Sequence, residues 1–228
     1  DIIPLEELYH ACQIAREIAM DDKWKVGRVI ARPYIGTKEG HFTRTSNRHD
    51  YALAPFSKTA LDSLKDAGLD VIGVGKIPDI FVDQGITRNI KTVSNEDGMN
   101  KTIELASDNF NGLAFINLVD FDAVYGHRRN AAGYGKAIEE FDVQLGELIN
   151  ELKEDDLLIV TADHGNDPTY RGTDHTREQV PLIIYSKQFN EMKVLNDGDS
   201  FGIIGSTICD NFNVKYNGIG SSILKLLK

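Results

Sequence analysis

Apolar residues recur at helical spacing in three stretches of the chain. Leu5, Leu8 and further apolar residues follow Pro4, which the first turn of a helix tolerates, so a helix is predicted there. Similar spacing predicts a shorter helix near residues 99–106 and a long amphipathic helix over about 134–152. Helices of this length need a covering partner for their apolar faces.

Short apolar runs alternate with these helices and predict strands. They cover residues 26–31, 70–75, 113–119, 157–161 and 180–185. Strands that alternate with helices indicate an α/β fold with a mostly parallel sheet that helices flank on both faces.

The first fifty or so residues follow this α/β rhythm less closely. Residues 33–50 are rich in Gly, Thr, Asn and Ser and predict a long loop. Ser57 is the predicted N-cap of a helix that ends at Gly68. We therefore predict a domain boundary near Ala54-Pro55, between a smaller domain over residues 1–54 and the core domain over residues 55–228.

Composition narrows the class of protein. The 228 residues are 41% hydrophobic and 26% charged, which is an ordinary globular balance. The net charge of −10 disfavours nucleic acid and anionic lipid as partners, and no apolar run is long enough to cross a membrane. The two cysteines, Cys12 and Cys209, do not make a disulfide scaffold and favour a reducing cytoplasm.

A basic block interrupts this acidic chain. Residues 23–48 contain seven basic side chains and one acidic one, a net charge of +6. Such a block is either a solvated face or a binding surface for an anion. Composition alone favours the solvated face.

Acidic and histidine residues follow two of the predicted strands. Asp120 and Asp122 come after the strand at 113–119, with His127 close behind, and 157–161 leads into Asp163-His164-Gly165-Asn166. His175 lies a few residues further on. Ligands of α/β proteins collect at the carboxyl ends of parallel strands, so these side chains are expected to meet.

This set of residues predicts a metal site. A single Asp-His pair after a strand is often a helix cap beside a surface histidine. Acidic and histidine residues after two strands are harder to explain in this way. Carboxylate and imidazole ligands suit Mn²⁺, Zn²⁺ or Fe²⁺. Two such ions about 4 Å apart can clamp a phosphoryl group. Arginines of the basic block could then bind phosphate, so phosphoryl transfer is the economical hypothesis.

Several longer motifs carry a resemblance to a known family. With Asp122, His127 and His175, the run Asp163-His164-Gly165-Asn166 resembles the alkaline phosphatase superfamily of metalloenzymes. Other segments are similar to the bacterial phosphopentomutase family, and this resemblance runs over essentially the whole chain from about Pro4. These segments are Gly27–Pro33, Phe42–Ala52, Val119–Asp122 with Tyr125–Arg129, Thr161–Asn166 and Gly172–Glu178.

The resemblance implies the interconversion of ribose 1-phosphate and ribose 5-phosphate, and of the 2-deoxyribose pair, in nucleoside catabolism. It implies an alkaline-phosphatase-like core with an inserted smaller α/β cap domain, of which residues 1–54 would be the C-terminal part. It also implies two Mn²⁺ ions, with Mg²⁺, Co²⁺ or Zn²⁺ as alternatives. By motif, Asp122, His127 and His175 would hold one ion, and Asp163 and His164 would contribute to the other.

The resemblance also implies a phosphate-binding set and a phosphothreonine mechanism. Arg28, Arg44 and Lys76 match positions associated with the substrate phosphate. In the family, a phosphothreonine transfers its phosphate through a sugar bisphosphate intermediate, so a sugar bisphosphate is a possible activator.

The chain departs from the family pattern in one large respect. The first core strand with its Asp ligand and the segment with the catalytic threonine have no counterpart here. The threonines of the matched segments lie outside that motif (Thr43, Thr45, Thr161 and Thr173). We therefore expect this chain to be the C-terminal portion of a longer enzyme and to be inactive alone.

Two other functions remain open at this point. The chain could belong to another member of the superfamily, such as a cofactor-independent phosphoglycerate mutase or a phosphatase. It could also be a non-catalytic fragment that binds metal or phosphate. The oligomeric state and the preference between ribose and deoxyribose stay undetermined.

Overall fold

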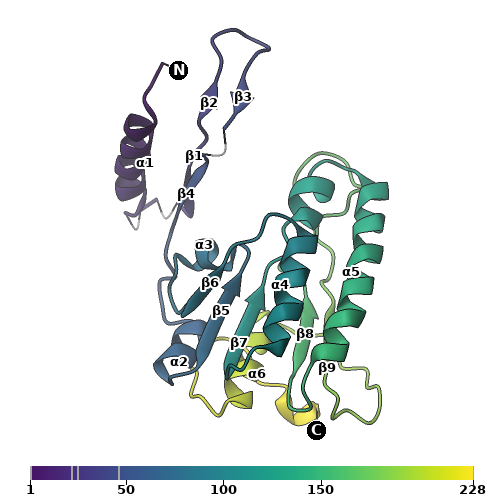
Figure 1. The fold of residues 1–228 in the computed structure, drawn as a ribbon. Helices are drawn as coiled ribbons and strands as arrows, with labels where there is room; N and C mark the ends of the chain where they lie inside the picture. Colours follow the sequence, from purple (N-terminus) through teal and green to yellow (C-terminus); the bar gives the residue numbers. More distant parts are fainter. Residues whose placement is uncertain (1, 22, 25, 46, 228) are drawn as a thin grey trace. The chain divides into compact units, whose positions relative to one another are not determined.

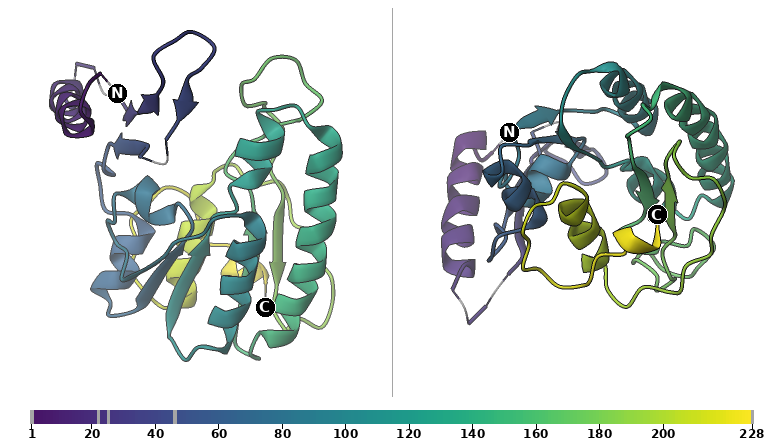
Figure 2. Two further views of the ribbon diagram at one scale, coloured as in Figure 1. Left: turned by 45° about the horizontal axis from the view of Figure 1, so that its top comes forward. Right: turned by 90° about the horizontal axis from the view of Figure 1, so that it is seen from below.

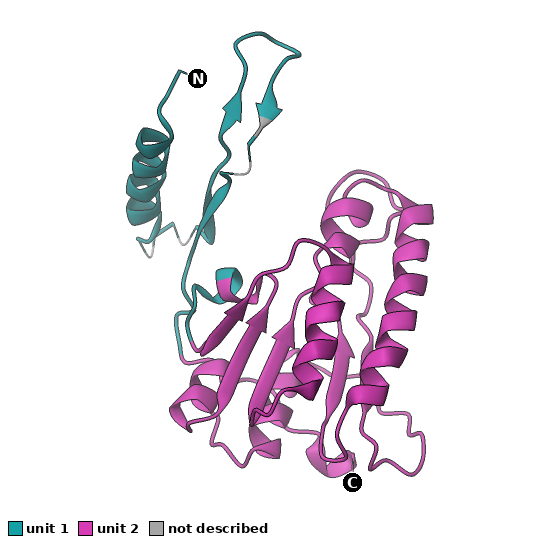
Figure 3. Ribbon diagram, in the orientation of Figure 1, with its two compact units in different colours: residues 1–57, 79–84 teal, residues 58–78, 85–228 magenta. Residues whose placement is uncertain are grey.

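The computed structural model describes residues 2–21, 23–24, 26–45 and 47–227, and divides them into two compact units (Figure 3). Unit 1 contains residues up to Ser57 together with 79–84, and unit 2 contains 58–78 and 85–228. The predicted boundary at Ala54-Pro55 lies just ahead of this division. That residues 1–54 form part of a cap domain stays a prediction.

The described residues of unit 1 up to Ser57 form one helix and two small antiparallel sheets. Its elements are α1 (Leu5–Ala19), β1 (Arg28–Ala31), β2 (Tyr34–Ile35), β3 (Thr43–Arg44) and β4 (His49–Ala52). β1 pairs with β4, β2 pairs with β3, and α1 packs against β1 and β4.

The loop predicted over residues 33–50 is therefore wrong in part. It contains the hairpin β2–β3 and the first residues of β4. The carbonyl of Pro33 accepts hydrogen bonds from the backbone N–H and the hydroxyl of Thr45, and the rings of Tyr34 and Phe42 meet edge to face at 5.1 Å. Strands of two residues are too short to give an alternating pattern, so the sequence carried no periodic signal for them.

Unit 2 has a parallel sheet at its centre. Its first elements are α2 (Ala60–Asp66), β5 (Asp70–Val74), α3 (Ile77–Phe81, whose end belongs to unit 1), β6 (Arg88–Ile90), α4 (Asn95–Ser107) and β7 (Gly112–Ile116). β5 lies between β6 and β7 and is parallel to both, with Val74 opposite Ile90 and Ile116. Ile72, Val74 and Leu105 form the buried centre of the unit, against which Phe110 packs.

The second half of unit 2 supplies two further strands and the helices that cover the strands. It contains a π-helical turn, η1 (Phe121–Gly126), then α5 (Ala131–Glu151), β8 (Leu158–Thr161), β9 (Leu182–Tyr185), α6 (Gly202–Asn211) and the 3₁₀ turn η2 (Leu224–Leu226). α4 and α5 pack together on one side of the strands, and α6 lies on the other, beside α2 (Figures 1 and 2). The predicted α/β class with parallel strands flanked by helices is confirmed.

Several details of unit 2 differ from the prediction. β9 runs antiparallel to β8, because the 180–185 strand returns along 157–161 instead of following a crossover helix. α2 is capped by Thr59, not Ser57, because Thr59 and Asp62 form a reciprocal capping box. The strand predicted over 113–119 ends at Ile116, where the chain turns toward η1, and α6 was not predicted at all.

Paired hydrogen bonds fasten the turn after β7. The carboxylate of Asp120 accepts from the backbone N–H of Asn95 at 2.7 Å, and the side-chain oxygen of Asn95 accepts from the N–H of Asp120 at 2.9 Å. Asp120 therefore has a structural role and holds the start of η1 against the N-terminus of α4.

Candidate metal centre

The π-helical turn η1 aligns the first two predicted ligands, Asp122 and His127. Residues five apart on an α-helix point about 140° away from each other. In η1 the backbone N–H of His127 instead donates to the carbonyl of Asp122 at 2.9 Å, a bond that spans five residues. Both side chains consequently face the same way at the carboxyl end of the strands.

η1 is held in place by aromatic packing. The ring of Phe121 lies 5.5 Å from that of Tyr134 and 6.2 Å from that of Phe141, both on α5. Asp122 follows Phe121 directly, so this packing also sets the direction of the carboxylate.

The two segments after β8 bring the remaining histidines to the same place. A single β-bridge pairs Gly165 with Thr176, which sets His164 beside His175. The two imidazole rings stack with their centroids 3.8 Å apart and their planes at 18°. A Cβ on residue 165 would lie 2.9 Å from the backbone carbonyl oxygen of Thr176, so a glycine permits this close approach.

Asp122, His127 and His175 converge as the sequence predicted. Nε2 of His175 lies 3.2 Å from Oδ1 of Asp122 and 3.2 Å from Nε2 of His127, and Nε2 of His127 lies 3.4 Å from Oδ2 of Asp122. One donor atom from each residue falls within 4.8 Å of the others. All three side chains are partly accessible, so an ion can reach them from solvent.

The hydrogen bonds around these residues fit a metal site. Nδ1 of His127 lies 2.5 Å from the carbonyl of Thr173, which can only accept, so Nδ1–H donates to it and Nε2 is the ring nitrogen that faces an ion. Nδ2 of Asn166 donates to Oδ1 of Asp122 at 2.6 Å and orients the carboxylate. This donor set, one carboxylate and two imidazoles with oriented partners, suits a divalent transition metal.

Asp163 and His164 lie next to this triad but are not part of it. Nε2 of His164 is 3.5 Å from Oδ2 of Asp163, and the Asp163 side chain is 74% exposed. Within the described residues, the two side chains supply a pair of donors without a third.

The predicted phosphate-binding residues are dispersed over the two units. Arg28 lies on β1 of unit 1, half-exposed, with Nη1 3.4 Å from Oδ2 of Asp50. Arg44 is in β3, and its side chain lies outside the described part of the chain, as does Lys25 of the basic block. Lys76 is exposed in the turn that follows β5, at the carboxyl edge of the parallel strands of unit 2.

A half-buried tyrosine lies near the charged groups of the site. Burial raises the pKa of Tyr134, and the nearby carboxylates of Asp122 and Glu178 raise it further. Tyr134 therefore stays protonated at neutral pH beside the triad.

Three residues that build the site were not predicted from the sequence. Asn166 is buried and bonded to Asp122, and Gly126 gives it room, because a Cβ at 126 would lie 2.5 Å from Nδ2 of Asn166. Arg129 donates to several groups of the segments that carry His164 and His175. All three residues stood inside the matched motifs, but nothing in the sequence assigned them a partner.

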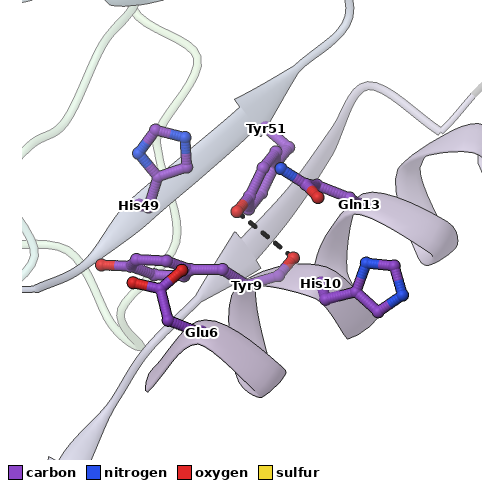
Figure 4. A pocket seen from close by; sticks show the side chains of 6 residues that line it. All are labelled: Glu6, Tyr9, His10, Gln13, His49 and Tyr51. Carbon is purple, nitrogen blue, oxygen red and sulfur yellow. Dashed lines mark hydrogen bonds between the residues drawn. The ribbon is translucent and has the colours of Figure 1, made fainter. Parts of the chain in front are cut away.

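Unit 1 contains a cavity of its own, of about 410 Å³. Figure 4 shows its lining: four side chains from α1 and two from β4, namely Glu6, Tyr9, His10, Gln13, His49 and Tyr51. The His49 ring meets that of Tyr51 edge to face at 4.5 Å, and burial raises the pKa of Tyr51. None of the residues predicted to bind metal or phosphate lines this cavity.

Comparison with known proteins identifies relatives at two levels. A profile described as the metalloenzyme superfamily matches residues 27–216. Over 98% of its length the chain is 59% identical to a protein of Clostridium botulinum named phosphopentomutase, and 58% identical to one of Clostridium beijerinckii with the same name. The chain spans 57% of the length of each of these relatives.

A solved structure is similar in fold. It is that of Leishmania mexicana phosphoglycerate mutase, at a TM-score of 0.58 and 18% identity, covering 74% of this chain and 39% of that one. This likeness supports the predicted α/β fold with parallel strands flanked by helices. Within the described residues, no helix is both long enough and apolar enough to cross a membrane.

Proposed function

The chain belongs to the metalloenzyme superfamily, and from that premise we propose that it supplies the metal-binding part of a phosphopentomutase. Such an enzyme interconverts ribose 1-phosphate and ribose 5-phosphate, and the 2-deoxyribose pair. The observation that carries the proposal is the convergence of Asp122, His127 and His175 within 4.8 Å. The identity of 59% to a named phosphopentomutase supports this activity over that of a phosphoglycerate mutase, for which the identity is 18%.

We propose that Asp122, His127 and His175 hold one divalent ion, and that this ion is Mn²⁺. Mg²⁺, Co²⁺ and Zn²⁺ also accept such ligands. When bound, the ion supplies positive charge that stabilises negative charge on phosphoryl oxygens. The chain's own contribution is to orient the ring of His127 with Nε2 toward the site, through Thr173, and to direct the carboxylate of Asp122 inward, through Asn166.

Asp163 and His164 are proposed to contribute to a second ion. His164 lies against His175 and Asp163 is open to solvent, so donors from these two residues border the first site. A third ligand for this second ion would come from outside the pair, as the family resemblance implies.

Arg28, Arg44 and Lys76 are proposed to bind the substrate phosphate. The guanidinium of Arg28 is half-exposed and its ion pair with Asp50 is long, at 3.4 Å, so a phosphate could compete for it.

A sugar bisphosphate activator, a place in nucleoside catabolism and a cytoplasmic location belong to the same proposal. The free thiols of Cys12 and Cys209 agree with a reducing compartment.

The first test is calorimetric titration of this chain with Mn²⁺. We expect the parent chain to bind the ion and the His175→Ala variant to lose binding. His10→Ala, an exposed histidine on α1, is the matched control and should bind like the parent. Absence of binding by the parent, or equal binding by His175→Ala, would refute the proposed site.

Turnover is tested in a longer polypeptide. The matched motifs hold no nucleophilic threonine, so we expect this chain alone to convert no ribose 1-phosphate. Joined to the part of the Clostridium botulinum relative that the match leaves out, it should convert ribose 1-phosphate and 2-deoxyribose 1-phosphate. Conversion of 3-phosphoglycerate instead would favour the phosphoglycerate mutase alternative, and metal binding without any turnover would favour a non-catalytic role.

A further inference from the structure

We propose that Arg129 is a positioning residue that pre-forms the metal site by fixing the segment before His175 and the amide of Asn166. This inference rests on the metal site of the proposed function. It concerns how the site is assembled, which neither the family match nor the named relatives address.

Arg129 is placed for this role by an unusual backbone conformation. It comes two residues after His127 and has φ of +52°, a left-handed value that side chains with a Cβ seldom adopt. Its backbone N–H donates to the carbonyl of Gly126 at 3.1 Å. From this turn the side chain reaches the two segments that follow β8 and donates hydrogen bonds to both.

The guanidinium holds the segment that precedes His175. Nε donates to the carbonyl of Gly172 at 2.5 Å, and Nη2 donates to that of Asp174 at 2.6 Å. The carbonyl between them, that of Thr173, faces Nδ1 of His127. Three consecutive carbonyls are thus bound by two side chains of one short motif, and His175 follows directly.

The same guanidinium also orients the carboxylate ligand through Asn166. Nη1 lies 2.8 Å from Oδ1 of Asn166 and also donates to the carbonyls of Asp167 and Gly126. Arginine has no acceptor, so the oxygen of the Asn166 amide must face it. The amide nitrogen is therefore left to donate to Asp122 at 2.6 Å.

These contacts require the planar fork of arginine. Three nitrogens of one rigid group bind carbonyls in different segments, and the ammonium of lysine, a single point on a flexible stem, cannot reach them all. Outer partners of metal ligands commonly contribute about 10- to 100-fold in metal affinity. A lysine at this position should keep the charge but lose that contribution.

The test compares Arg129→Lys with Arg128→Lys, the same substitution at the exposed neighbour. Calorimetry with Mn²⁺ should show about 10- to 100-fold weaker binding for Arg129→Lys, and parental affinity for Arg128→Lys. Equal Mn²⁺ affinity of Arg129→Lys and the parent, or an equal loss in both variants, would overturn the inference.

A second readout needs no metal. In the metal-free chain, amide hydrogen exchange over residues 166–176 should be faster in Arg129→Lys than in Arg128→Lys and unchanged in β5 and β7. Unchanged exchange in that segment contradicts the inference, even if the parent chain binds no Mn²⁺ and the proposed function fails. If the parent chain binds Mn²⁺ and the Arg129 variants bind it with the same affinity, the positioning role is refuted but the metal site is not.

Two further variants separate positioning from general destabilisation. Millimolar methylguanidinium should restore Mn²⁺ binding to Arg129→Ala, whereas a variant weakened by global unfolding would gain nothing from a denaturant-like cation. If the Arg129 variants do not fold, Asn166→Ala removes the link to Asp122 and leaves the bonds to Gly172 and Asp174 in place. Its Mn²⁺ affinity should fall without faster exchange at 170–175, and parental affinity would count against the inference.

Discussion

At the scale of single residues, the site depends on two glycines that allow other groups to come close to the backbone. Asn166 reaches Asp122 because residue 126 has no Cβ, and Gly165 lets Glu178 and Thr176 close over the segment after β8. The convergence of Asp122, His127 and His175 could be predicted from residue type and from their positions after two strands. Their supporting residues could not, since a close approach between residues 126 and 166 has no signature in either local sequence.

Gly126→Ala is expected to disrupt the carboxylate ligand. The new methyl group would lie 2.5 Å from Nδ2 and 2.6 Å from Cγ of Asn166, so the amide must move away from Asp122. We expect Mn²⁺ affinity to fall about 10-fold or more, as for other outer partners of metal ligands. Calorimetry measures this change.

Gly135→Ala is the matched control for that variant. Gly135 lies in α5, and a Cβ there meets nothing within 4 Å. The substitution should leave Mn²⁺ affinity unchanged and stabilise the helix by about 0.5–1 kcal/mol. A Gly126→Ala chain that binds Mn²⁺ like the Gly135→Ala chain would contradict the expected packing.

At the scale of elements, helices and strands with a clear period were predicted well and short or irregular ones were not. The long helix α5 and the buried strand β5 begin and end close to the predicted residues. β2 and β3 are too brief to show a period, and the direction of β9 relative to β8 depends on a pairing that no local pattern encodes. The π turn η1 brings together Asp122 and His127 at a five-residue spacing, which a search for helical periodicity passes over.

The N-terminus of α2 offers a test of which residue caps it. The Thr59 hydroxyl accepts from the backbone N–H of Asp62 at 3.3 Å, and the Asp62 carboxylate accepts from the N–H of Thr59 at 2.7 Å. Thr59→Ala should therefore lower the free energy of unfolding by about 0.5–2 kcal/mol. Ser57→Ala, at the cap first predicted, should change it by less than about 0.5 kcal/mol. Urea denaturation distinguishes the two, and a larger loss for Ser57→Ala would restore the sequence-based prediction.

The start of α4 provides a pH-dependent contribution to stability. The ammonium of Lys101, bonded to the carboxylate at 2.8 Å, and the backbone N–H of Val93 lower the pKa of Asp97 below its ordinary value. A carboxyl group whose pKa is lower in the folded state than in the unfolded state stabilises the fold when the pH is above the unfolded-state pKa. This stabilisation is lost as the pH falls through the folded-state pKa.

Asp97→Asn should accordingly be less stable than the parent near neutral pH. The difference in unfolding free energy between the two chains should shrink as the pH falls below about 4 and then through the lowered pKa of Asp97 in the folded state. Urea denaturation across this range measures it, with Asp142→Asn, an exposed acid on α5, as the control for loss of one negative charge. A difference that grows toward acid would show that the carboxylate of Asp97 does not stabilise the fold in its ionised form.

At the scale of the whole molecule, the two units have unequal cores. Within the described residues, the apolar side chain of unit 1 that is buried is that of Ala31, whereas unit 2 buries Leu64, Val71, Ile72 and Val74 almost completely. The sequence predicted this asymmetry only indirectly, as a weaker α/β rhythm in the first fifty residues. Large apolar side chains of unit 1 remain exposed, including Ile18 and Trp24.

Unequal cores should give unequal local stability. Two-stranded sheets are marginal by themselves, and segments with few buried apolar contacts open at low free energy. We expect the amides of β1–β4 and β2–β3 to exchange with solvent at least about 10-fold faster than those of β5 and β7, as an opening free energy lower by about 1.4 kcal/mol would produce. Hydrogen exchange on the intact chain, read peptide by peptide, measures both units in one sample. Equal rates would mean that the units open together, and the stability of the metal site in unit 2 would then depend on residues far outside its own core.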